Sequence, residues 1–425
     1  MTLTPYREVL AAPGVRRLVL FSILFRIPSL ATGVALTLHV VTTLGRGYAE
    51  AGLVGTAFTL ATALGQPVRG RAVDRVGLRR AIAPALVAVA VMYAVIPFVG
   101  FWVLLPVIFV CSLVPLPIFT VTRQSLSAMV PVSQRRTAFA LDSMGVELSF
   151  MAGPALGVLA ATRFATTTAL MVIGALVVGS GVSLMIFNPP TRAGDAGGRE
   201  AAAEQPASEG QEVPATGLGS GDRARIRWSP ALAIAVAAAV SATVVLAGTD
   251  VSIVAFARAH HSLSWTGGVF ITWGLGSILG ALVYGAMRRP VPILWLVLML
   301  GTLTIPIGLT PNMALLAIAI LPAAAACAPV ITATANAMAE LVPERALGEA
   351  MGWHASALTA GTALGAPLAG AAMDRYGPWS GFATVGLAGA LLAASGFVVT
   401  GLARRRRRAD DRIRPRRVAA GSLSD

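Results

Sequence analysis

Long apolar runs recur along this chain, and they constrain its fold more than any other feature. A helix needs about 20 apolar residues to cross the hydrocarbon core of a bilayer, and runs of that length follow one another with short polar breaks. Only 12% of the residues are charged, against roughly 25% in an ordinary soluble domain. A chain of this kind cannot cover itself with a wetted surface, so the sequence predicts an all-α integral membrane protein.

Twelve runs can be delimited, six on each side of a polar stretch, and the prediction is therefore twelve transmembrane helices in two six-helix bundles. The stretch 188–228 is rich in Ala, Gly, Glu and Pro and has no apolar period, which is typical of a flexible linker. The predicted divisions are a first bundle at 1–187, the linker at 188–228, a second bundle at 229–403 and a basic tail at 404–425. The runs are Leu18–Val41, Ala51–Val68, Ile82–Phe98, Trp102–Ala128, Thr137–Ala161, Thr166–Phe187, Ala231–Ala255, Thr266–Ala286, Val291–Leu309, Met313–Met338, Ala350–Met373 and Phe382–Leu402.

The arginines indicate which side of the membrane each break occupies. All 33 basic residues are Arg, and cytoplasmic loops carry an excess of basic residues. With the N-terminus inside, most arginines fall in cytoplasmic breaks, in the linker and in the tail, and only Arg46, Arg163, Arg258 and Arg375 fall outside. Both termini are therefore predicted to be cytoplasmic.

The same distribution bears on the partners of this basic chain. Its net charge of +14 lies in alternate breaks and in the tail from Arg404 to Arg417, which predicts contact with anionic membrane lipids and argues against nucleic acid. The absence of Lys and the abundance of Ala and Arg suggest a GC-rich bacterial genome. We therefore expect a multi-pass protein of the bacterial cytoplasmic membrane.

The two halves of the chain resemble each other, which predicts a pseudo-symmetric pair of bundles. The glycines at positions 52, 65 and 70 recur 215 residues later, at positions 267, 280 and 285. A shorter echo relates GRAVDRVG at 70–77 to GAAMDRYG at 370–377. A constant offset of this kind is what a duplicated six-helix unit leaves behind.

The break after the second run carries a motif that resembles the signature loop of the major facilitator superfamily. That resemblance implies the twelve-helix fold in two bundles and secondary transport by alternating access. Gly70 and Gly77 are expected to permit a tight turn, and the arginines to anchor the loop at the lipid headgroups. The residues that carry the motif are Gly70, Asp74, Arg75, Gly77, Arg79 and Arg80.

In the family, this loop holds the two halves together on the cytoplasmic side when the protein is open outward. By resemblance, Asp74 should meet the start of the eleventh helix near Gly348 to Met351, and Glu349 could accept a hydrogen bond from Arg75 or Arg79. An anion is favourable at a helix N-terminus. The alternative is that the basic loop only sets the topology.

The fifth run contains Gly153, Pro154 and Gly157, which resemble the Gly-Pro motif of the exporters in the superfamily, mainly its drug-proton antiporters. Small residues recur every four positions along this run, from Gly145 to Ala161, and form a ridge on one helix face. We expect such ridges where the two halves slide against each other. The alternative is generic tight packing.

Charges inside the runs are costly and therefore informative, at roughly 2.5 to 3.5 kcal/mol each on insertion scales. Arg26 and Glu147 lie at similar depths in the first and fifth runs, which predicts an ion pair that is either structural or a substrate or proton site. Asp142 lies about 140° around the helix from Glu147 and is expected to face the loop arginines. Asp250 is expected to line a central cavity or to pair with Arg258.

Other polar and aromatic residues were weighed as cavity residues. Trp273 and Trp353 lie deep in the eighth and eleventh runs and are candidates. His39 and His354 could titrate near neutral pH, but a lone histidine on a helix is more often a packing residue. Drug antiporters usually carry an Arg in the middle of helix 4, whereas the run from Trp102 to Phe119 has no charge, so their usual proton arrangement is not expected here.

These observations favour a monomeric secondary transporter that moves a small molecule out of the cell, with protons as the expected coupling ion. An uptake permease of the same fold and a non-transporting membrane sensor or scaffold are the alternatives. An enzyme or ATP-driven pump is not expected, because the chain has no Lys for a phosphate-binding loop or Schiff base and no His-Glu-x-x-His run for zinc. No cofactor or metal is expected.

Overall fold

The computed structural model describes residues 4–191, 226, 228–262, 265–287 and 289–421. Every regular element in these ranges is a helix, and each of the twelve predicted runs coincides with helical structure. Eight helical segments in the described ranges are long and apolar enough to cross a membrane. The prediction of an all-α membrane protein with a twelve-helix fold is therefore confirmed.

The first half begins with a short helix, α1 (Thr4–Ala11), and continues through the predicted runs in order. The first run ends in a π-helical turn, η1, and the third in a 3₁₀ turn, η2. Its further elements are α2 (Pro13–Leu38), η1 (His39–Thr43), α3 (Tyr48–Val76), α4 (Leu78–Val95), η2 (Ile96–Phe98), α5 (Phe101–Ser112), α6 (Ile118–Met129), η3 (Val132–Gln134), α7 (Arg135–Arg163) and α8 (Thr166–Phe187).

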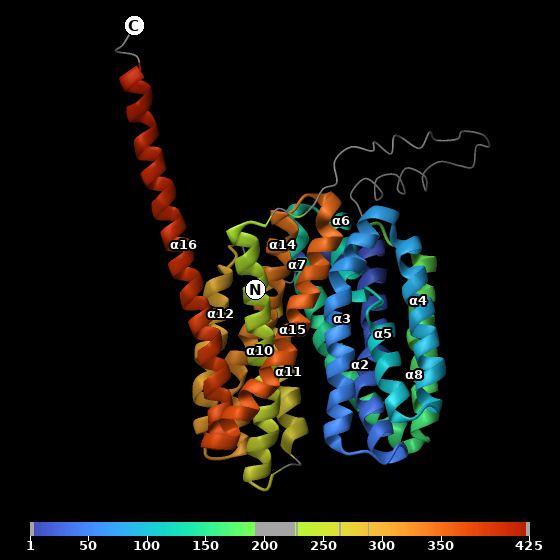
Figure 1. The fold of residues 1–425 in the computed structure, drawn as a ribbon. Helices are drawn as coiled ribbons and strands as arrows, with labels where there is room; N and C mark the ends of the chain where they lie inside the picture. Colours follow the sequence, from blue (N-terminus) through green and yellow to red (C-terminus); the bar gives the residue numbers. More distant parts are fainter. Residues whose placement is uncertain (1–3, 192–225, 227, 263–264, 288, 422–425) are drawn as a thin grey trace, which may run out of the picture.

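The second half repeats this order. Most of the linker, 192–225 and 227, lies outside the described residues. The elements are α10 (Pro230–Ala259), α11 (Thr266–Ala286), α12 (Ile293–Thr304), η5 (Ile305–Leu309), α13 (Met313–Ala319), α14 (Leu321–Leu341), η6 (Glu344–Ala346), α15 (Leu347–Tyr376) and α16 (Trp379–Gly421). The helix α16 passes through the predicted tail without a break and projects from the bundle (Figure 1).

The fourth predicted helix is not continuous, which corrects the sequence analysis. Helix α5 ends at Ser112 and α6 begins at Ile118. The intervening residues include Pro115 and Pro117, which have no backbone N–H to donate within a helix and whose rings clash with the preceding turn. The tenth helix is divided in the same way before Pro322, which lies in the first turn of α14.

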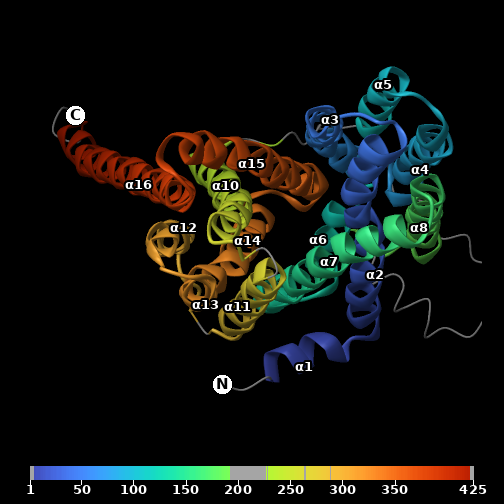
Figure 2. The same cartoon turned by 90° about the horizontal axis from the view of Figure 1, so that it is seen from below.

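The two halves lie side by side, the first in blue and green and the second in yellow and red (Figure 1). Two pairs of helices meet across the junction, α3 with α15 and α7 with α11, as the view along the bundle also shows (Figure 2). Within the halves, α2 packs along α7 and α10 packs along α15. Equivalent helices therefore make equivalent contacts, as pseudo-symmetric bundles should.

The ridges of small residues lie mainly inside the halves, not between them. A Cβ at Gly153 or Gly157 on α7 would collide with backbone or Cβ atoms of α2. Gly361 and Gly365 on α15 likewise contact α10, and Gly280 on α11 contacts α14. The expectation that these ridges form the sliding surface between the halves is wrong, because most of them set the close packing of each bundle.

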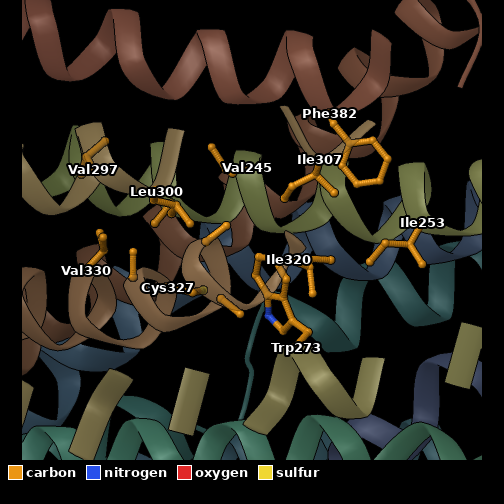
Figure 3. Packing of buried hydrophobic residues seen from close by; sticks show 14 of the residues in the cluster. Val245, Ile253, Trp273, Val297, Leu300, Ile307, Ile320, Cys327, Val330 and Phe382 are labelled. Carbon is orange, nitrogen blue, oxygen red and sulfur yellow. The ribbon is translucent and has the colours of Figure 1, made fainter. Parts of the chain in front are cut away.

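Each half has its own apolar core, and the largest cluster belongs to the second half. Trp273, Ile253, Ile320 and Phe382 pack there with residues of α10 to α14 and α16 (Figure 3). A further cluster, which includes Val15 and Leu126 of the first half and Leu232 and Met351 of the second, spans both halves. Outside that shared cluster, the separate cores allow each half to behave as a rigid unit.

Candidate functional site

We call the end of the bundle at which α8 ends and α10 begins the linker end, and the opposite end the far end. The first contact between the halves joins the end of α3 to the start of α15. At the linker end, the Asp74 carboxylate accepts hydrogen bonds from the backbone N–H groups of Gly348 (2.9 Å) and Glu349 (2.8 Å). Gln124 of α6 donates a third, at 2.9 Å. The expected meeting of Asp74 with the eleventh helix is present, and we call it the latch contact.

The partner of Glu349 differs from the expected one. Arg71 donates to the Glu349 carboxylate and pairs with it. Arg75 and Arg80 are exposed and make no ion pair in the described part of the chain. Arg79 donates to the backbone oxygen of Met185 (3.0 Å), which ties α4 to α8 within the first half. Arg75 lies one turn after Arg71 on the same side of α3, next to the end of that helix, and is exposed there.

The glycines of the motif have two different roles. Gly77 ends α3 with φ of 80°, and Gly377 ends α15 with φ of 85°, so the two echoed octapeptides share a left-handed turn. Gly70 is not part of a turn, contrary to expectation. It lies inside α3, and a Cβ there would overlap the backbone of Gly348. Gly70 therefore allows the two helices to touch.

The second contact between the halves joins α7 and α1 to the end of α11. Thr137 donates to the carbonyl of Gly285 (2.9 Å). The Tyr6 hydroxyl lies 2.9 Å from the carbonyl oxygen of Ala281 and 2.8 Å from that of Leu282. Burial raises the pKa of Tyr6 to about 12, so its hydroxyl keeps the proton that it donates. The short helix α1 thus binds the second half, although it belongs to the first half.

At the far end, the same helix faces are apart. Gly52 and Thr56 lie 18 residues, or five turns, before Gly70 and Asp74 and share their face of α3, yet both are exposed. On α15, Ala363 and Pro367 continue the face that contacts α3 and are exposed as well. The deepest hydrogen bond between α3 and α15 in the described residues runs from Ser356 to the carbonyl of Ala63 (2.6 Å). Along α3 and α15 the halves are therefore joined at the linker end and apart toward the far end, whereas α7 and α11 stay in contact deeper in the bundle, at Met151 and Gly274.

A buried network of charged side chains lies next to the latch contact. Arg26 of α2 donates to Asp142 of α7 (2.6 Å), and Arg123 of α6 donates to the other oxygen of the same carboxylate (2.9 Å). Arg123 also contacts His354 of α15 at 2.9 Å. Arg26 and Asp142 are 0% exposed, Arg123 4% and His354 1%. We call these four residues the charge network.

The charge network corrects three expectations. Arg26 pairs with Asp142 and not with Glu147. Asp142 does bind one of the arginines expected in a cytoplasmic break, Arg123, but both side chains are buried in the bundle. The fourth helix carries a buried charge after all, because the break at residues 113–117 lets α6 restart with Arg123 inside the bundle.

Sequence reasoning misses Arg123 as a site residue and treats His354 as more often a packing residue. Counting arginines places Arg123 on the cytoplasmic side, although it lies within the fourth run, Trp102–Ala128. Its neighbours gave a signal, since Thr120, Gln124 and Ser127 share a polar face of α6 that the structure buries. No signal of this kind pointed to His354, whose partners come from distant parts of the chain.

Glu147 lies elsewhere and meets a different acid. Ser277 of α11 donates to the Glu147 carboxylate (2.7 Å), so this contact also crosses between the halves. Asp250 of α10 is close enough for its charge to interact with that of Glu147. Neither acid has a basic side chain within ion-pair distance in the described residues. We call Glu147 and Asp250 the acid pair. The expected pair of Asp250 with Arg258 does not form, and Arg258 is exposed.

The two candidate tryptophans occupy ordinary packing positions. Trp273 is 4% exposed inside the apolar core of the second half (Figure 3), and its indole N–H has no partner in the described residues. Trp353 packs edge-on against Trp228, with ring centroids 5.4 Å apart. Pro154 lies within α7 between the two glycines that contact α2. No group of metal-ligating side chains comes together in the ranges that the structure describes.

Comparisons with known proteins agree with this architecture. A family model described as Major Facilitator Superfamily matches residues 18–289 and 242–424. The human organic anion transporter MFSD10 (TETRAN) has 19% identity and a TM-score of 0.66, with 89% of this chain and 99% of that chain covered. A bacterial homologue of the iron transporter ferroportin, solved in an outward-facing state, has 14% identity and a TM-score of 0.66, with 91% and 98% covered. These two likenesses concern the fold alone. No curated protein sequence matched.

Proposed function

The chain belongs to the major facilitator superfamily, and on that basis we propose that it is a secondary active transporter of a small molecule in the bacterial cytoplasmic membrane. The observation that carries the proposal is that the same faces of α3 and α15 touch at the linker end and are exposed toward the far end. Two halves whose helices α3 and α15 touch at one end and part toward the other can rock so that these helices touch at the other end. With the linker and both termini in the cytoplasm, the present arrangement is open outward.

The latch contact suits a reversible closure. Its hydrogen bonds run from a side chain to backbone N–H groups at a helix start, which water can satisfy when the halves separate. Arg71 and Glu349 add an ion pair at the rim, where exchange with solvent is easy. Asp74 and these residues therefore act as a cytoplasmic gate in the proposed cycle.

We further propose that the acid pair couples transport to protons. Two carboxylates that share a membrane interior without a basic partner favour the binding of a proton or another cation. One acid comes from each half, and Ser277 bonds Glu147 across the junction. Rocking of the halves would therefore change the surroundings of the acid pair, which is what coupling requires.

Efflux is the proposed direction, supported by the Gly153-Pro154-Gly157 motif, and uptake by the same fold is the alternative. A monomer suffices for this mechanism, since both junction contacts lie within one chain. We also propose that the arginines at 404–417 contact anionic lipids, as their number and position in the sequence favour.

The test is transport in proteoliposomes with an imposed pH gradient, after a growth screen against toxic compounds has named a substrate. We expect gradient-driven flux for the wild type and its loss in Glu147→Gln. Arg75→Gln is the matched control, because Arg75 is exposed and unpaired. Gradient-driven flux that persists in Glu147→Gln would exclude proton coupling through this acid. If the wild type moved none of the compounds against which it protects cells, the proposal that it is a transporter would be wrong.

A further inference from the structure

His354 is the point at which the charge network of the first half is joined to the second half. Its Nδ1 atom lies 2.9 Å from Nη1 of Arg123 on α6, and its Nε2 atom lies 2.9 Å from the hydroxyl of Thr334 on α14. The side chain is 1% exposed and belongs to α15, six residues after the latch contact at Gly348. The imidazole therefore bridges the two halves from inside the closed end.

The directions of these hydrogen bonds define the protonation state of the ring. A guanidinium has only N–H donors, so Nδ1 of His354 must accept and cannot carry a proton. The Thr334 hydroxyl donates to the carbonyl oxygens of Val330 and Ile331 (3.0 Å each), so it accepts from Nε2–H. Only the neutral imidazole with its proton on Nε2 satisfies both contacts.

A proton added to Nδ1 would place two donors and two positive charges against each other at 2.9 Å. The network already has an excess of positive charge, since one carboxylate is shared by two guanidiniums. No acid contacts the ring in the part of the chain that the structure describes. Of the other charged groups on α15 and on the helices packed against it, Asp74 binds the start of α15, Arg71 pairs with Glu349, Glu50 pairs with Arg46 and Asp250 interacts with Glu147. Arg69 of α3 is buried and leaves Nε and Nη2 without a partner in the described residues. The exposed groups are Arg75, Arg258, Glu340, Glu344, Arg345, Asp374 and Arg375.

We propose that His354 is a proton-operated release for the closed linker end. Neutral His354 holds Arg123 and Thr334 together across the halves. When the ring takes up a proton on Nδ1, the hydrogen bond from Arg123 is lost, and the arrangement in which the linker end opens and the far end closes becomes favoured. The inference presumes the alternating halves of the proposed function, but it concerns a conformational equilibrium that can be measured without a substrate.

The test measures distances between spin labels in nanodiscs from about pH 8 to about pH 5, a range that brackets the ordinary histidine pKa of about 6.5. A background with Cys111→Ser and Cys327→Ala frees the chain of native cysteines. Label pairs are then placed at exposed positions. The far-end pair is Leu53→Cys with Arg375→Cys, and the linker-end pair is Val76→Cys with Arg345→Cys.

We expect acidification to move the wild type toward a shorter far-end distance and a longer linker-end distance, with a population ratio that changes about tenfold or more. In His354→Gln the amide can accept from Arg123 and donate to Thr334 but cannot titrate, so the ratio should change by less than about twofold over the same range. His39→Gln is the matched control. His39 is also buried and bonded to a threonine, Thr166 (3.0 Å), but both residues belong to the first half, so the response should remain.

Two results would overturn the proposal: a wild type whose distances do not respond to pH, or an unchanged response in His354→Gln. Should that variant fail to fold, ¹⁵N-histidine solid-state NMR of the unsubstituted chain decides the matter. If a buried histidine ring becomes an imidazolium with the same pH midpoint as the change in distances, the proposal is supported. If the ring stays neutral while the distances change, the proposal is refuted. A pH response without flux of any compound would reject the proposed function alone, whereas flux without a pH response would reject the role of His354 alone.

Discussion

The charge network is buried between helices and the acid pair is half-buried between helices, and the two sites differ in how their charges are compensated. In the network, Asp142 accepts from Arg26 and Arg123, and each charge has an oppositely charged partner within 2.9 Å. In the acid pair, Ser277 donates a hydrogen bond to Glu147, and neither Glu147 nor Asp250 has a basic side chain within ion-pair distance among the described residues. Burial of a charge is costly unless it is paired, so the network is complete in itself and the acid pair depends on protons or a cation from outside.

The largest expected difference between the two sites concerns stability, and Asp142→Asn tests it. The substitution would leave two buried guanidiniums without a carboxylate, and breaking a buried pair by removing one partner costs about 3–5 kcal/mol. We expect a strongly lowered midpoint of thermal unfolding in detergent, or loss of folded protein. Glu147→Gln is the matched control and should unfold at or above the wild-type temperature. Equal decreases in unfolding temperature for Asp142→Asn and Glu147→Gln would contradict this difference between the charge network and the acid pair.

The second difference concerns transport, and Glu147→Gln sharpens it. Gln keeps the size and can still accept from Ser277, but it cannot exchange a proton. We expect gradient-driven flux to fall about tenfold or more, a transition-state cost of about 1.4 kcal/mol, with little change in unfolding temperature. Asp250→Asn should have the same signature. If either variant lost both stability and flux, the acid pair would be a structural element like the charge network.

The latch contact lies between the two extremes, because Asp74 is buried but binds backbone N–H groups instead of a charge. Asp74→Asn keeps one acceptor oxygen and loses the other, and removal of a helix-capping acceptor costs about 0.5–2 kcal/mol. We expect more labelling of a cysteine placed at Ser127, which is buried at the linker end. Arg75→Gln should leave labelling unchanged. An Asp74→Asn variant that labels like the wild type would argue that the network alone keeps this end closed.

The smallest expected effect comes from Ser277→Ala. The hydroxyl makes one hydrogen bond across the halves, to Glu147 at 2.7 Å, and a single bond of this type contributes about 0.5–1.5 kcal/mol. We expect a shift of a few degrees or less in unfolding temperature and a changed pH profile of flux, because Glu147 loses a donor to its ionised form. Ser252→Ala, which removes a hydroxyl bonded within α10, should leave that pH profile unchanged.

Much of the architecture could be read from the chain alone, and the reason is local. A helix that crosses a membrane must be apolar along its own length, so the runs and their breaks marked the helices to within a few residues. The duplicated glycines indicated the pseudo-symmetric halves. The contact of Asp74 with the start of α15 followed from a motif whose position is tied to one loop. Errors in the helices arose at paired prolines, as at Pro115 and Pro117, where composition stays apolar while the backbone cannot remain helical.

The partners of the buried charges could not be read in this way, and only the tertiary structure decided them. Asp142 and Glu147 are five residues apart on α7, but they point to different helices, one to Arg26 and Arg123 and the other to Ser277. The partner of each acid depended on how α7 is rotated against α2, which the glycines of α7 that contact α2 determine. It also depended on the position at which α6 begins after the break. The sequence by itself determined that this chain forms membrane helices in two related halves, since hydrophobic length belongs to each segment. The pairing of charges, and the bridge through His354, arose from packing between segments far apart in the chain, because electrostatic contact requires side chains to approach within a few ångströms.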